Sequence, residues 1–65
     1  MSSSNEVTIT VTLSDSQAEA LAQFLKRVGF SDYRALAINE EEAYAMRSAG
    51  EAVRRGLDEQ GYSPR

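Results

Sequence analysis

The most conspicuous charged group in this 65-residue sequence is the run of three acids Glu40, Glu41 and Glu42. Carboxylates can ligate a metal or act as an acid–base pair. Neighbouring residues of a helix point about 100° apart, however, so three consecutive glutamates do not converge on one ion. Acids at the start of a helix complement the positive end of its dipole. We therefore predict that the run opens a helix and offers an acidic surface to a basic protein partner.

The sequence has no residues typical of a catalytic or metal site. It contains neither cysteine nor histidine, which removes the thiolate, the commonest metal ligand and the usual general base. It also has no phosphate-binding glycine motif and no nucleophile elbow. We expect a non-enzymatic protein with no cofactor and no bound metal.

The composition favours a protein partner over a nucleic acid. Seven basic residues stand against ten acidic ones, for a net charge of −3. Nucleic-acid binding normally rests on basic groups that neutralise phosphates, although a local basic patch can suffice. No apolar stretch approaches the ~20 residues that span a bilayer, and the leader does not resemble a secretory signal. We expect a cytoplasmic protein that has no membrane partner.

The elements that would position these residues begin with a strict alternation. Apolar side chains occupy every second position from residue 7 to residue 13, and Thr8, Thr10 and Thr12 lie between them. This pattern predicts a β-strand with one buried face. The rest of the chain offers only residues 33–38 as a poor internal partner, and small chains without staples often oligomerise. We therefore predict a homodimer paired through this strand, with the dimer face Val7, Ile9, Val11 and Leu13.

Two helices are predicted after the strand. The first begins at a cap formed by Ser14, Asp15 or Ser16, and Gly29 is its natural stop. The second runs from Glu40 to about residue 60 with Asn39 as its cap. Residues 31–38 are compatible with a strand, a loop or a helix, and a break near Asn39 is favoured. The predicted fold class is α+β, one strand and two helices (β-α-α), in a domain of residues 7–62 between a disordered leader (1–6) and a tail (63–65).

The stretch "TVTLSDSQAEALAQFLKRVGFS" resembles the first half of the ribbon-helix-helix repressors. That resemblance implies a paired strand whose outward side chains enter the major groove. By position these would be Thr8, Thr10 and Thr12, with Ser31 near a phosphate. It gives an alternative function, a DNA-binding transcriptional regulator. The strand face has no Arg, Lys, Asn or Gln, the side chains suited to bidentate recognition of bases.

A second resemblance spans most of the chain. "ALAQFLKRVGFSDYRALAINEEEAYAMRSA" together with "GYSPR" resembles a group of small uncharacterised proteins of proteobacterial prophages and integrative elements. This implies a mobile-element origin and no particular activity. Our leading hypothesis is an accessory protein of a phage or mobile element. It would act by protein–protein interaction through the acidic surface, for example against a host nucleic-acid-binding complex.

Overall fold

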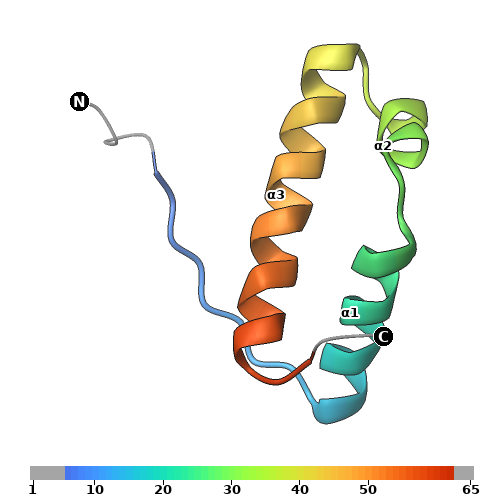
Figure 1. Cartoon of the computed structure of the whole chain (residues 1–65). Coiled ribbons are helices and arrows are strands. Elements are labelled where there is room, and N and C mark those ends of the chain that lie inside the picture. The colour runs from blue at the N-terminus through green and yellow to red at the C-terminus, as the bar shows by residue number, and fades with distance from the viewer. Residues whose placement is uncertain (1–5, 63–65) are drawn as a thin grey trace.

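A computed structural model describes residues 6–62 of the chain. Three helices follow one another: α1 (Asp15–Arg27), α2 (Phe30–Leu36) and α3 (Glu40–Glu59). Both α1 and α2 pack against the long α3 (Figure 1). The described residues contain no strand, so the fold class is all-α.

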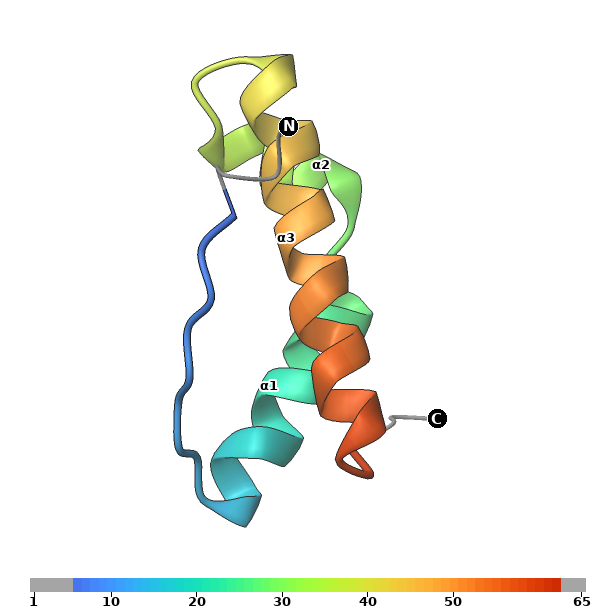
Figure 2. The same ribbon diagram turned by 90° about the vertical axis from the view of Figure 1, so that its left-hand side faces the viewer.

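The predicted α+β fold is therefore wrong. The predicted dimer strand is extended but lacks backbone hydrogen bonds to any other part of residues 6–62. Extended backbone becomes a strand only when a second strand pairs with it, and the sole internal candidate, residues 33–38, lies largely within α2. Residues 7–13, called the arm below, run away from α1 alongside the rest of the molecule (Figures 1 and 2). The predicted tail and all of the leader but Glu6 lie outside the described residues.

Helix α1 begins at a complete capping box. Of the three caps that the sequence allows, Ser14 is the one used: its hydroxyl accepts from the backbone N–H of Gln17 at 3.1 Å. The Gln17 side chain accepts in return from the backbone N–H of Ser14 at 2.9 Å. Two free donors of the first turn are thus satisfied, which stabilises the point where the arm meets the helix.

Helix α2 forms within the segment that the sequence left ambiguous. The backbone N–H of Gly29 donates to a carboxylate oxygen of Asp32 at 2.8 Å, which helps to start the helix. The Phe30 ring then stacks at a tilt on Tyr44 of α3, with ring centroids 4.7 Å apart. Tyr33 lies over Gly50 of α3, where only a residue without a side chain leaves room for its ring. These two aromatic contacts hold a helix of only seven residues in place.

The predicted break before α3 is confirmed. Asn39 caps this helix, because its side-chain oxygen accepts from the backbone N–H of Glu42 at 2.8 Å. At the other end, the backbone N–H of Tyr62 donates to the carbonyl of Leu57 at 2.9 Å. Gly61 lies between them at φ 96°, a left-handed conformation that favours glycine. The chain therefore turns back toward α1 after α3.

The buried core is small. Within residues 6–62 its members are three alanines and one leucine, namely Ala18, Ala22, Leu25 and Ala43. Small side chains let the helices approach closely, but they remove little apolar area from water. Most of the larger apolar side chains lie at least partly on the surface, and their positions define the candidate site.

Candidate interaction surfaces

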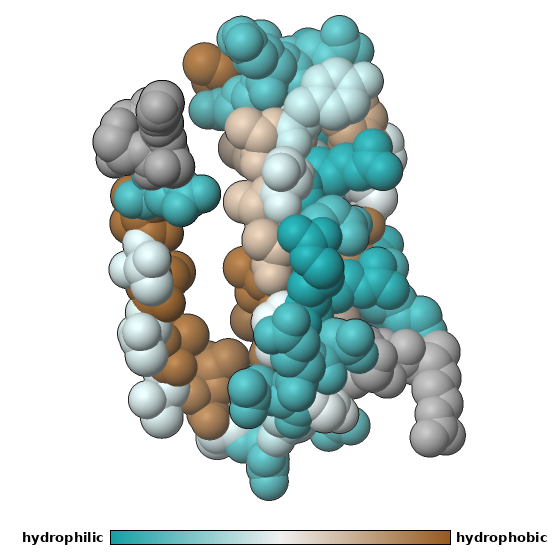
Figure 3. Space-filling view, turned by 60° about the vertical axis from the view of Figure 1, so that its left-hand side comes forward, coloured by the Kyte–Doolittle hydropathy of each residue, from teal (hydrophilic) through white to brown (hydrophobic). Residues whose placement is uncertain are grey.

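The arm exposes every large apolar side chain that it carries. Val7 is 84% exposed and Ile9 is 75% exposed, and exposure falls to 39% at Leu13, where the arm joins α1. The arm stands off the body with its apolar side chains directed toward α3 across an open gap (Figure 3). The predicted dimer face is thus an uncovered apolar surface in the single chain. Exposed apolar area of this kind marks interaction sites in soluble proteins.

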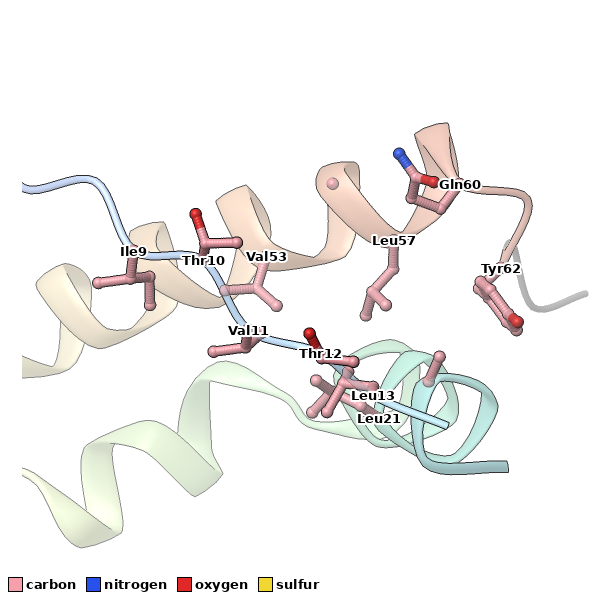
Figure 4. A pocket seen from close by; sticks show the side chains of 12 residues that line it. Ile9, Thr10, Val11, Thr12, Leu13, Leu21, Val53, Leu57, Gln60 and Tyr62 are labelled. Carbon is pink, nitrogen blue, oxygen red and sulfur yellow. The ribbon is translucent and has the colours of Figure 1, made fainter. Parts of the chain in front are cut away.

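A groove lies between the arm and the two longer helices. Its volume is about 630 Å³, within the range of pockets that accommodate ligands. Aliphatic side chains form most of its walls, and no charged side chain lines it among the described residues (Figure 4). The larger ones are Ile9, Val11 and Leu13 from the arm, Leu21 from α1, and Val53 and Leu57 from α3.

The threonines and Ser31, proposed to contact DNA, do not form one surface. Thr8, Thr10 and Thr12 are exposed on the arm, and Thr10 and Thr12 also line the groove. Ser31 is exposed in the first turn of α2 and does not line the groove. The structure therefore does not gather the four residues around one ligand.

The acidic run divides into two parts. Glu42 is half-buried, and its carboxylate accepts from the backbone N–H of Ile38 at 2.8 Å. It therefore satisfies a backbone donor at the start of α3. Glu40 and Glu41 are exposed and remain available to a partner. Within residues 6–62, no cluster of three or more acids could hold a metal ion.

Next to the exposed acids lie two large aliphatic residues that the sequence analysis did not single out. Leu36, the last residue of α2, is 82% exposed, and Ile38, in the connection between α2 and α3, is 83% exposed. We call Leu36, Ile38, Glu40 and Glu41 the tip. No sequence pattern sets these two residues apart; they become notable because the fold leaves them uncovered. The tip thus combines apolar and acidic side chains.

At the far end of the groove, Tyr62 connects the end of the chain to the start of α1. Its hydroxyl donates to a carboxylate oxygen of Asp15. This hydrogen bond is the main cause that raises the pKa of Tyr62 above 10.0, with smaller contributions from desolvation and from the negative charges of Asp15 and Glu19. Tyr62 also lines the groove, so the contact fixes one of its walls.

No helix within residues 6–62 has the length and hydropathy to cross a bilayer. The chain belongs to a family of unknown function (DUF7706). The sequence model of that family matches residues 1–65. Neither a curated protein nor a solved structure matches the chain.

Proposed function

We propose that this chain is a non-enzymatic protein that acts by binding a basic protein partner through the tip. The observation that supports the proposal is the exposure of Leu36 and Ile38, each above four fifths, beside Glu40 and Glu41. Apolar side chains supply binding energy when a partner covers them, and surrounding charge selects and steers the partner. A partner surface with an apolar pocket and a basic rim would complement the tip.

The sequence supports two more specific statements, one about the origin of the protein and one about its partner. Resemblance to small proteins of prophages and integrative elements supports a role as an accessory protein of a phage or mobile element, acting in the cytoplasm. A host nucleic-acid-binding complex fits as the target, because such proteins carry basic surfaces that complement an acidic one. The net charge of −3 would favour encounter with such a surface.

Site-specific photo-crosslinking tests this function. A photoreactive amino acid replaces Ile38 in cells that naturally carry the gene, and a control chain carries it at Ser48, an exposed position farther along α3. The expected result is a cross-link from position 38, absent at position 48, to a protein with a basic surface.

Charge reversal supplies the second part of the test. Glu40→Lys with Glu41→Lys should abolish the cross-link from position 38. The matched control, Glu51→Lys with Glu59→Lys, produces the same change in net charge on α3 away from the tip and should preserve it. Equal cross-linking in both double variants would contradict the proposal. Adducts to nucleic acid in place of protein would favour the DNA-binding alternative.

A further inference from the structure

The arm and the groove form a second apolar surface, separate from the tip, that the single chain leaves uncovered. We infer that a second copy of this chain covers this surface, with the arm of each copy lying in the groove of the other. This inference does not depend on the proposed function of the tip. It concerns side-chain contacts between two all-α chains and requires no pairing of strands.

The first support for a second copy is the distribution of charge. Each chain carries a net charge of −3, so two copies repel one another at long range. The groove is uncharged among the described residues, and between Val7 and Leu13 the arm has only apolar residues and threonines. This is therefore a face on which a like-charged copy can dock with little electrostatic cost.

The second support is that the two sides of the contact suit one another. The arm presents a row of β-branched and aliphatic side chains, and the groove offers aliphatic walls contributed by Leu21, Val53 and Leu57. One chain carries both halves, so a two-fold axis would bury both arms and both grooves at once. Such self-complementary interfaces are the commonest form of homodimer.

The third support is the exposure of the arm. Val7, Ile9 and Val11 are 84%, 75% and 68% exposed, so the single chain leaves most of this apolar row uncovered. An interface limited to the arm and the groove is small, so we expect a weak dimer whose population depends on concentration.

The first experiment measures mass against concentration. Sedimentation equilibrium of the full chain should show a mass that rises from 7.1 kDa toward twice that value across the micromolar range. Ile9→Lys, which places a charge in the contact, should raise the dissociation constant by at least about tenfold. Thr8→Lys adds the same charge to the arm outside the groove and should change the constant less than about threefold.

Circular dichroism, which measures helix content, shows whether each variant still folds. Ile9 is exposed in the single chain, so the circular dichroism of Ile9→Lys should match that of the unchanged protein. A chain that stays at the monomer mass throughout, or equal weakening by the two lysine variants, would overturn the inference.

The second experiment uses the absence of native cysteine. One copy carries Val11→Cys, and a second copy of distinguishable mass carries Leu57→Cys. Oxidation of the mixture should give a mixed disulfide, which an arm lying in its own groove cannot form. A Thr8→Cys copy mixed with Leu57→Cys should give much less. Exclusive formation of the symmetric Val11→Cys disulfide would instead show that the arms meet each other, and it would refute the arm-in-groove arrangement.

Discussion

The contact between Tyr33 and Gly50 gives the sharpest prediction about stability. A side-chain carbon added at Gly50 would overlap the hydroxyl oxygen of Tyr33 and lie 3.3 Å from the adjoining ring carbon. It would also lie 3.6 Å from a methyl carbon of Leu25, an ordinary van der Waals contact, so the clash is with Tyr33. Gly50→Ala therefore forces the Tyr33 ring away from α3. Overpacking of this kind costs about 1–3 kcal/mol.

A helical Gly→Ala change also stabilises, by about 1 kcal/mol, because glycine has a poor helix propensity. Gly56 isolates this effect: it lies in the same helix, and a carbon added there meets nothing within 4 Å. Gly56→Ala should stabilise by about 1 kcal/mol. The difference in unfolding free energy between the two alanine variants should thus equal the steric cost, about 1–3 kcal/mol.

Thermal unfolding followed by circular dichroism, at a concentration where the chain is monomeric, measures this difference. Each kcal/mol corresponds to about 4–8 °C in a domain of this size. Combining Gly50→Ala with Tyr33→Phe removes the oxygen that clashes, so the double variant should recover part of the loss relative to Tyr33→Phe alone. If Gly50→Ala stabilises as much as Gly56→Ala, the packing of α2 on α3 described here is wrong.

Three further predictions concern the helix ends. Ser14→Ala should lower the unfolding free energy by about 1 kcal/mol in urea denaturation, because it breaks the capping box of α1; an unchanged midpoint would contradict the role of this cap. Asn39→Ala should cost a similar amount, whereas Asn39→Asp, which keeps the acceptor for the Glu42 N–H, should preserve most of the stability. Tyr62 has a pKa raised above 10.0, so its contact with Asp15 stabilises the fold below pH 10 and this contribution is lost as the pH rises through the folded-state pKa. A pH titration of the tyrosine ring signals by NMR, which separates Tyr62 from the other two tyrosines, should show late ionisation of Tyr62, and Asp15→Asn should bring it earlier; no change in that variant would contradict the hydrogen bond.

The helix boundaries were predictable because they depend on a few neighbouring residues. Asn39 followed by three acids indicates a helix start, and α3 begins at Glu40. For α1 the sequence offered several caps, and both Ser14 with Gln17 and Ser16 with Glu19 have the spacing of a capping box; the structure uses Ser14. The short α2 was ambiguous, since seven residues give little periodicity and aromatic contacts with α3 hold it. Tertiary packing determines whether such a short segment is helical, and sequence patterns do not encode packing directly.

The arm shows why the fold class was wrong. Alternating apolar residues predict that one side of residues 7–13 is buried and that the backbone is extended. Residues 7–13 do run as an uncoiled segment (Figure 1), but residues 6–62 supply neither a partner strand nor burial of the apolar face. The site was missed for a related reason. The acids of the tip were conspicuous in the sequence, whereas Leu36 and Ile38 become notable only once the fold leaves them uncovered.

The positions of the two surfaces along α3 determine whether they can work independently. The acids of the tip lie in the first turn of this helix, and Val53 and Leu57 lie in its second half. Glu41 and Val53, the groove residue of α3 nearer the tip, are separated by roughly 18 Å of helix at 1.5 Å per residue. That is about two Debye lengths at physiological ionic strength, so charge at the tip opposes contact between two copies at the groove only weakly. A dimer joined through the grooves would therefore keep both tips free and would present two acidic surfaces to a partner. Two-site binding can exceed the affinity of either site alone, which gives a chain of this size a means of binding tightly with a small contact.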